Sequence, residues 1–146
     1  MTALKILVVD DNFQDVILFR SVLKKAAVHL PFRIVCDETN SGVEARNLIS
    51  AGHYDMVFLD QQMPDQDGLV CFDSICQIKW PVGTKRPAII AYSNCDLSEF
   101  RARCLRAGMD AFFVKYLSEN ELLALIGKYY VDKLPSLIGL TQNCAG

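Results

Sequence analysis

The sequence predicts a single parallel α/β domain in three layers, and three observations lead to this prediction. The chain has 146 residues, which fits one domain. Short apolar runs alternate with longer segments of helical periodicity. The runs are rich in β-branched residues and almost continuously hydrophobic, as expected of parallel strands covered on both faces. The predicted strands are Lys5–Val9, Phe32–Cys36, Met56–Leu59, Ala88–Tyr92 and Ala111–Val114.

Helix signals follow each predicted strand. Three segments have the spacing of a capping box, in which an N-cap side chain and a glutamate three residues later bond each other's backbone. These segments are Ser41-x-x-Glu44, Asp96-x-x-Glu99 and Ser118-x-x-Glu121. Gly52 and Gly108 stand where helices should end. The predicted order is therefore β-α repeated five times, with right-handed crossovers and an exposed loop over Trp80–Pro87.

The first predicted helix contains four consecutive apolar residues, Val16–Phe19. At 100° per residue they span most of the helix circumference, so they cannot all face the sheet. We expect the core stripe of this helix to be Leu18, Val22 and Ala26. The apolar side chains left partly exposed are then Phe13, Val16 or Ile17, either as ordinary surface or as a docking face for a helical partner.

Composition and charge exclude several classes of protein. Hydrophobic residues make up 51% of the chain, which excludes an intrinsically disordered protein. A net charge of −2, with no long basic run, argues against a nucleic-acid or membrane-surface binder. The early aspartates argue against a signal peptide, and no apolar stretch is long enough to cross a bilayer. The six cysteines form no C-x-x-C pair, so we expect reduced thiols and a cytoplasmic location.

Polar residues that could act together in phosphoryl transfer follow four of the predicted strands. In open α/β sheets, ligands bind at the edge where the carboxyl ends of the strands lie. These residues are Asp10, Asp11, Asp60, Ser93 and Lys115. Clustered carboxylates suit Mg²⁺, a carboxylate can accept a phosphoryl group, and a lysine can offset the charge of phosphoryl oxygens. Taken singly, each has an ordinary explanation: Asp11 could cap a helix, and Lys115 could be solvated. Their conjunction favours phosphoryl transfer, with Asp60 as the better nucleophile because it stands alone after a central strand.

The chain resembles the receiver domain of bacterial two-component response regulators over roughly residues 4–133. The motifs that carry the resemblance are Asp10-Asp11 after ILVV, FLDQQMPDQDG over Phe58–Gly68, Ser93, and AGMDAFFVK ending at Lys115. The resemblance implies a flavodoxin-like three-layer sandwich, with a five-stranded parallel sheet of order 2-1-3-4-5 and five helices. Because the helical pattern ends at Pro135, we expect a receiver domain over residues 1–133 and a C-terminal tail or linker over 134–146.

The resemblance further implies roles for individual residues. Asp60 corresponds to the phosphoacceptor. The Mg²⁺ ligands would be Asp10, Asp11, Asp60 and the backbone carbonyl of Gln62. Ser93 and Lys115 would contact the phosphoryl group, and Ser93 and Phe112 would act as switch residues. Such a chain is a signalling domain, with magnesium-dependent self-phosphorylation and autodephosphorylation as its only enzymatic activity.

The resemblance also implies partners. The phosphoryl group would come from a histidine kinase or a histidine phosphotransfer protein. The face running from the fourth to the fifth helix would contact an output domain or a second copy of the chain. No nucleic acid or membrane is expected to bind this domain.

Two positions depart from the family pattern. Tyr116 follows the lysine where the family usually has proline. Because a cis bond before another residue costs about 2.5–4 kcal/mol, the departure favours a trans Lys115–Tyr116 bond, but the sequence leaves both forms open. Asn94 replaces the small residue that the family prefers after Ser93. Gln62 and Cys95 occupy positions that in the family tune the lifetime of the phosphoryl group.

Two other functions remain open at this point. The first is a pseudo-receiver that binds partners constitutively, which Tyr116 and Asn94 favour and the complete acid set opposes. The second is a phosphatase of the haloacid-dehalogenase type. That class needs an Asp-x-Asp pair after the first strand, where this chain has Asp10-Asp11-Asn12.

The three candidate acids and Lys115 together account for the whole excess charge of −2.

Overall fold

The computed structural model describes residues 3–130, in which strands and helices alternate strictly along the chain. The elements are β1 (Ala3–Val9), α1 (Phe13–Ala27), β2 (Arg33–Thr39), α2 (Gly42–Ala51), β3 (Met56–Asp60), α3 (Gly68–Cys76), β4 (Ala88–Ser93), α4 (Ser98–Ala107), β5 (Ala111–Val114) and α5 (Glu119–Tyr129). The predicted segment boundary at residues 133–134 lies outside the described residues.

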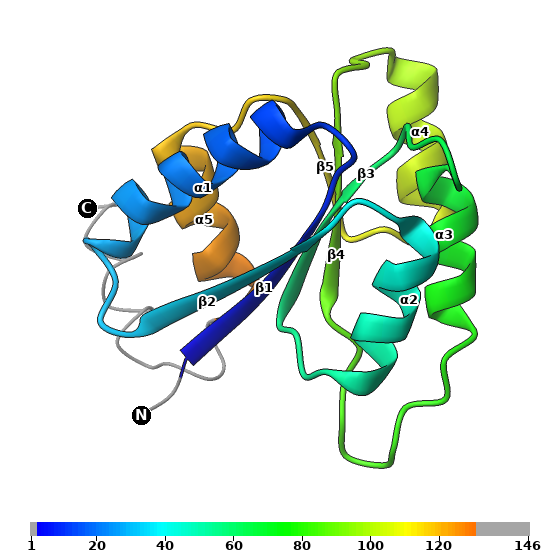
Figure 1. The fold of residues 1–146 in the computed structure, drawn as a ribbon, viewed down its shortest axis with the longest axis horizontal. Coiled ribbons are helices and arrows are strands. Elements are labelled where there is room, and N and C mark those ends of the chain that lie inside the picture. The colour runs from blue at the N-terminus through cyan, green and yellow to red at the C-terminus, as the bar shows by residue number, and fades with distance from the viewer. Residues whose placement is uncertain (1–2, 131–146) are drawn as a thin grey trace.

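All five strands are parallel and lie in the order β2-β1-β3-β4-β5. Helices α1 and α5 cover one face of the sheet, and α2, α3 and α4 cover the other (Figure 1). This arrangement confirms the predicted three-layer fold and strand order. Because the strands are parallel, their carboxyl ends all lie along one edge of the sheet.

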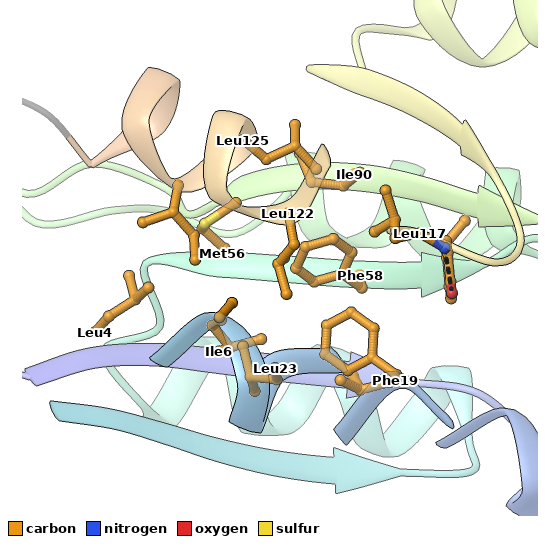
Figure 2. Close-up of a cluster of buried hydrophobic side chains, with 14 of the residues drawn as sticks. Leu4, Ile6, Phe19, Leu23, Met56, Phe58, Ile90, Leu117, Leu122 and Leu125 are labelled. Atoms are coloured by element: carbon orange, nitrogen blue, oxygen red, sulfur yellow. Dashed lines mark hydrogen bonds between the residues drawn. The ribbon is translucent and has the colours of Figure 1, made fainter. Parts of the chain in front are cut away.

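The core lies on both faces of the sheet, because successive strand residues point to opposite sides. Ile6, Phe58 and Ile90 pack beneath α1 and α5 (Figure 2). Leu7 and Leu59, which alternate with them, belong to the cluster on the opposite face. Helix packing on both faces explains why the central strands are almost continuously hydrophobic.

Strand β2 differs from its prediction. It covers Arg33–Thr39 instead of Phe32–Cys36, because it pairs with β1 along its whole length, from Ala3 opposite Arg33 to Val9 opposite Thr39. It is an edge strand whose residues are mostly half-buried or exposed. The expectation of a strand covered on both faces is therefore wrong here, since the backbone ladder and not continuous hydrophobicity sets its length.

The core stripe of α1 also differs from its prediction. The buried apolar residues are Val16, Phe19, Leu23 and Ala26. Leu18 is 47% exposed, so its assignment to the core is wrong. Phe13 and Ile17 are exposed as expected, at 75% and 50%. The helix is rotated so that Asp15, which precedes the apolar run, faces inward.

Side-chain caps begin four of the helices. Ser118 and Glu121 form the predicted capping box of α5. Ser41 caps α2, but the carboxylate of Glu44 accepts a hydrogen bond from the Thr39 hydroxyl, so only half of that box forms. Asn12 caps α1 and Asp67 caps α3. The capping role considered for Asp11 thus belongs to its neighbour.

Helix α4 begins without a side-chain cap, and the capping box predicted at Asp96 is wrong. Its N-cap position is Leu97, so Asp96 lies one residue outside the cap. Gly108 ends α4 in the left-handed conformation, with φ of 113°, which only glycine adopts at little cost. The predicted loop over Trp80–Pro87 contains neither helix nor strand. Within residues 3–130, no helix has the length and apolar character of a membrane span.

Candidate functional site

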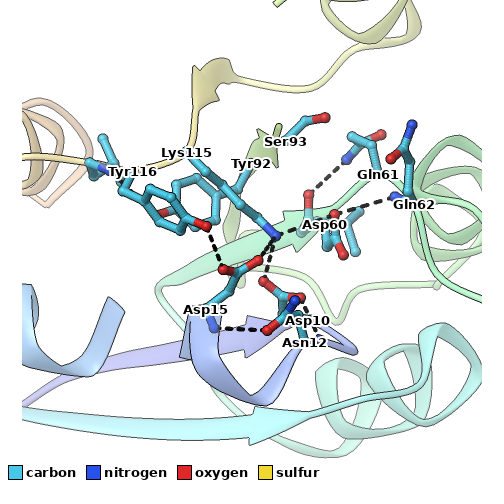
Figure 3. Close-up of polar contacts among 12 residues, drawn as sticks. Asp10, Asn12, Asp15, Asp60, Gln61, Gln62, Tyr92, Ser93, Lys115 and Tyr116 are labelled. Atoms are coloured by element: carbon cyan, nitrogen blue, oxygen red, sulfur yellow. Dashed lines mark hydrogen bonds and ion pairs between the residues drawn. The ribbon is translucent and has the colours of Figure 1, made fainter. Parts of the chain in front are cut away.

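Three carboxylates meet at the carboxyl edge of the sheet, and two of them, Asp10 and Asp60, are labelled in Figure 3. Asp10 follows β1, and Asp60 ends β3, the neighbour of β1 in the sheet. Oxygen atoms of Asp10, Asp11 and Asp60 all lie within 4.8 Å of one another. Asp10 and Asp60 are buried, whereas Asp11 is exposed. Several carboxylate oxygens this close together are suitable ligands for a hard divalent cation.

Lys115 brings a positive charge to these carboxylates from the end of β5. Its Nζ lies 2.8 Å from Asp10 Oδ2, 2.9 Å from Asp15 Oδ2 and 3.7 Å from Asp60 Oδ1. Only 2% of the side chain is exposed. Burial alone would lower the pKa of Lys115, but the hydrogen bonds to Asp10 and Asp15 outweigh it and raise the pKa above its usual value. The buried side chain is therefore an ammonium ion.

Asp15 belongs to this site, although sequence reasoning missed it. It accepts hydrogen bonds from Lys115 Nζ at 2.9 Å and from the Tyr116 hydroxyl at 2.8 Å. Burial opposes ionisation of Asp15, but these two hydrogen bonds prevail and lower its pKa. One signal was available in the sequence: Asp15 lies four residues before Phe19, at the spacing that places two side chains on the same helix face.

The Lys115–Tyr116 peptide bond is cis. The sequence leaves both forms open, and the trans form is favoured only by the general cost of a cis bond before a residue other than proline. Tyr116 is 54% exposed, and its hydroxyl points back to Asp15 (Figure 3).

Asp60 is a carboxylate in an environment that disfavours its charge. Burial is the main reason that its pKa is raised to about 7; Asp10 raises it further, and Lys115 opposes the increase. The backbone N–H of Gln62 donates a hydrogen bond to Asp60 Oδ1 at 3.3 Å. A divalent cation beside these carboxylates would favour the ionised form of Asp60.

Ser93 lies beside Asp60, because it ends β4 one residue after Tyr92, which pairs with Asp60. Its hydroxyl accepts a hydrogen bond from the backbone N–H of Cys95 at 3.1 Å. Gln62 is exposed after the end of β3. With Cys95 and residues of α4 it lines a hollow of about 260 Å³ next to the site.

Phe112 is 3% exposed on β5 and packs edge-on against Phe100 of α4, with ring centroids 5.9 Å apart. Its side chain therefore lies in the interface between β5 and α4. A change in the position of either element would change the packing of this ring.

Glycine at the end of the loop after β3 leaves room for the Gln61 side chain. The Gly68 N–H donates to the Gln61 carbonyl at 3.1 Å, folding the loop back on itself. A Cβ at Gly68 would lie 2.4 Å from the Gln61 side chain, closer than real contacts allow. A larger residue at position 68 would therefore displace the buried Gln61 side chain, whose Nε2 donates to the Leu59 carbonyl at 2.8 Å.

Comparisons with known proteins agree with this geometry. The family model for the response regulator receiver domain matches residues 6–127. The chain is 34% identical over 128 residues to hybrid signal transduction histidine kinase L of Dictyostelium discoideum, covering 86% of this chain and 7% of that protein. It is 33% identical over 132 residues to the aerobic respiration control sensor protein ArcB of Escherichia coli K12, covering 89% and 16%. The chain thus spans only a small part of each of these relatives.

Solved structures give the same result. The receiver domain of the histidine kinase CKI1 from Arabidopsis thaliana is similar at a TM-score of 0.64 and 32% identity, with 76% of this chain and 80% of that chain covered. The receiver domain of a sensor histidine kinase from Pseudomonas aeruginosa, whose structure has a magnesium ion in its active site cleft, matches at a TM-score of 0.72 and 23% identity, with 88% and 98% covered. The family match over most of the chain, on a sheet that brings the motif acids to one edge, shows that this protein belongs to the response regulator receiver domain family of two-component signalling.

Proposed function

We propose that Asp60 accepts a phosphoryl group from a phosphohistidine and that this transfer requires Mg²⁺. One observation carries the proposal: three carboxylates, two of them buried, have oxygens within 4.8 Å of one another, and a buried ammonium lies 3.7 Å from Asp60. This combination of anionic oxygens and one fixed cation is what phosphoryl transfer to a carboxylate needs.

The chemistry of the donor set fits Mg²⁺. Asp10, Asp11 and Asp60 offer only hard oxygen atoms, and the backbone carbonyl of Gln62 is the fourth ligand that we propose. When bound, Mg²⁺ supplies positive charge that offsets the charge of the phosphoryl oxygens. Its affinity should depend on ionised Asp60, whose pKa is about 7 without the cation.

The protein residues then have distinct roles in the transfer. An oxygen of Asp60 attacks phosphorus, the bond from phosphorus to the donor histidine nitrogen breaks, and that nitrogen takes a proton from solvent. Lys115, held at the site as an ammonium, donates hydrogen bonds to the transferred group. Ser93, next to Asp60 on β4, does the same with its hydroxyl. Movement of Ser93 and repacking of Phe112 would then transmit the change to α4 and β5.

The proposed donor is a histidine kinase or histidine phosphotransfer protein. The exposed apolar residues Phe13, Ile17 and Leu18 on α1 support this choice, because they would contact a helical partner and Phe13 lines a hollow together with Asp10 and Asp11. The proposed readout surface is the α4–β5–α5 face, where Leu105, Val114 and Tyr116 are exposed, for an output domain or a second copy of the chain.

The five described cysteines are free, which fits a cytoplasmic location. We assign the receiver domain to residues 1–133 and a tail or linker to 134–146.

The test is incubation of the full chain with Mg²⁺ and acetyl phosphate, followed by intact mass spectrometry. Wild type should gain one phosphoryl group, and Asp60→Asn should gain none. Asp73→Asn, an exposed acid on α3, is the matched control and should react like wild type. An adduct that persists in Asp60→Asn would overturn the assignment. A wild-type chain that takes neither Mg²⁺ nor phosphoryl would be a constitutive binding module.

A further inference from the structure

Asp15 contacts Lys115, and Tyr116 contacts Asp15, yet the phosphoryl transfer described above uses neither residue. Asp15 is 4% exposed and lies in the first turn of α1, where the Asn12 side chain accepts a hydrogen bond from its backbone N–H at 3.1 Å. One carboxylate oxygen accepts from Lys115 and the other from the Tyr116 hydroxyl. Both oxygens of this buried acid are therefore engaged, and its position is fixed from three sides.

The contacts of Lys115 are unequal. An ammonium has three N–H donors, and two of them are engaged by Asp10 at 2.8 Å and Asp15 at 2.9 Å. Asp60 Oδ1, at 3.7 Å, is beyond hydrogen-bond distance. The ring of Tyr92 lies beneath the ammonium, with its centroid 5.6 Å from Nζ. In this state Lys115 is held closer to α1 than to the residue proposed to carry the phosphoryl group (Figure 3).

We propose that Asp15 is a positioning residue that retains Lys115 and thereby competes with the phosphoryl group for its hydrogen bonds. This inference rests on the proposed function of Asp60. A phosphoryl group on Asp60 needs an N–H donor from Lys115. The hydrogen bond that Asp15 accepts from the ammonium opposes movement of Lys115 toward that group. Asp10 does not compete in the same way, because bound Mg²⁺ would satisfy its charge.

Tyr116 moderates this competition through Asp15. A carboxylate that already accepts a hydrogen bond from a hydroxyl binds a second donor less strongly, because part of its charge is already neutralised. The Tyr116 hydroxyl should therefore weaken the hold of Asp15 on Lys115. Tyr116 stands where the family usually has proline. This chain therefore has both Asp15, which retains Lys115, and a hydroxyl that weakens this retention.

The two residues should have opposite effects on the affinity for beryllium trifluoride, a stable mimic of a phosphoryl group on a carboxylate. Calorimetry at saturating Mg²⁺ measures that affinity. Asp15→Asn should bind the mimic roughly three- to tenfold more tightly, the effect of losing one charge-assisted hydrogen bond. Tyr116→Phe should bind it about two- to threefold more weakly, since a neutral hydrogen bond has a smaller effect. In the Asp15→Asn background, Tyr116→Phe should have no further effect.

Glu38→Gln is the matched control for charge. Glu38 lines the neighbouring hollow with Asp10 and is half exposed, so its removal takes away one nearby negative charge without touching Lys115. Its affinity for the mimic should equal that of wild type. An equal gain in Glu38→Gln and Asp15→Asn would mean that net charge and not positioning is responsible, and would overturn the proposal.

Nitrogen-15 NMR of the Lys115 ammonium gives a readout that a purely structural role would not change in this way. Ammonium protons should exchange with solvent faster in Asp15→Asn and more slowly in Tyr116→Phe than in wild type. If Asp15→Asn does not fold, Tyr116→Phe decides alone: weaker binding and slower exchange support the proposal, and unchanged or tighter binding refutes it. If wild type itself binds no mimic and forms no adduct, the proposed function fails. If wild type binds but the variants equal it, only this inference fails.

Discussion

The metal-free protein stabilises the ionised form of Asp60 poorly. Asp60 is 6% exposed, and burial with Asp10 nearby raises its pKa to about 7, above the ordinary value of 3.8. A group whose pKa is raised on folding favours the folded state below its unfolded pKa, and this contribution is lost as the pH rises through the folded pKa. For Asp60 the loss should fall between about pH 4 and pH 7.

Asp60→Asn should therefore stabilise the metal-free protein, and more so at pH 8 than at pH 5. The amide keeps a hydrogen-bond acceptor for the Gln62 N–H but carries no charge to bury. The gain at pH 8 should be on the order of 1–2 kcal/mol. Urea unfolding in EDTA at both pH values measures it, with Asp73→Asn as the exposed control. A gain that is the same at pH 5 and pH 8 would contradict the assigned cause.

The residues of the site differ in how far the sequence could reveal them. Asp10, Asp60 and Lys115 each follow an apolar strand, so parallel topology alone brings them to one edge. Asp15 has no such marker, because a helix residue reaches the site only if the helix is rotated correctly. The four apolar residues after it permit more than one rotation. The rotation seen here is accompanied by hydrogen bonds that Asp15 accepts from Lys115 and Tyr116, which lie 100 and 101 residues away in the sequence.

At the scale of single elements, equal motifs gave unequal results. Asp96 and Glu99 have the same spacing as Ser118 and Glu121, yet only the second pair forms a capping box. Spacing indicates which residue could cap, but the start of the helix depends on the loop before it. In α4 the chain stays extended through Leu97, which lines the hollow beside Gln62. Tertiary placement of that loop therefore decides the cap.

Two substitutions compare these helix starts directly. Ser118→Ala removes one side of a complete capping box and should lower the free energy of unfolding by about 1 kcal/mol. Asp96→Ala should change it by less than about 0.5 kcal/mol, because Asp96 is exposed and does not cap α4. Chemical denaturation of both variants in EDTA measures the difference. Equal losses would show that Asp96 caps α4 in solution.

At the scale of the whole molecule, the fold followed from simple patterns because its central strands are buried on both faces. Residues alternate between the two core clusters along β1, β3 and β4, and each strand is almost entirely apolar. Strand β2 lies at the edge, so its hydrophobic run is shorter than its hydrogen-bonded ladder. Patterns of hydrophobicity report burial, and they fail where pairing continues without burial.

Charge is also unevenly distributed over the whole molecule. The chain has 17 acidic and 15 basic side chains, so it is nearly balanced. Yet at one edge of the sheet the buried carboxylates of Asp10, Asp15 and Asp60 all pair with the ammonium of Lys115, and the exposed Asp11 adds a fourth negative charge beside them. Repulsion at this edge opposes folding unless a cation is present. The stability of the entire domain should therefore depend on divalent cations.

Mg²⁺ should raise the thermal midpoint of the full chain. A ligand that binds only the folded state at 100 times its Kd adds about 2.7 kcal/mol, which corresponds to a rise of roughly 5–10 °C for a domain of this size. The rise should shrink at pH 5.5, because protons then compete for Asp60, whose pKa is about 7. Calorimetric scans with Mg²⁺, and with NaCl of equal ionic strength, separate binding from screening.

Asp11→Asn removes an exposed ligand without disturbing the core and should reduce the rise strongly. An equal rise in NaCl, or an undiminished one in Asp11→Asn, would place the cation elsewhere on the molecule.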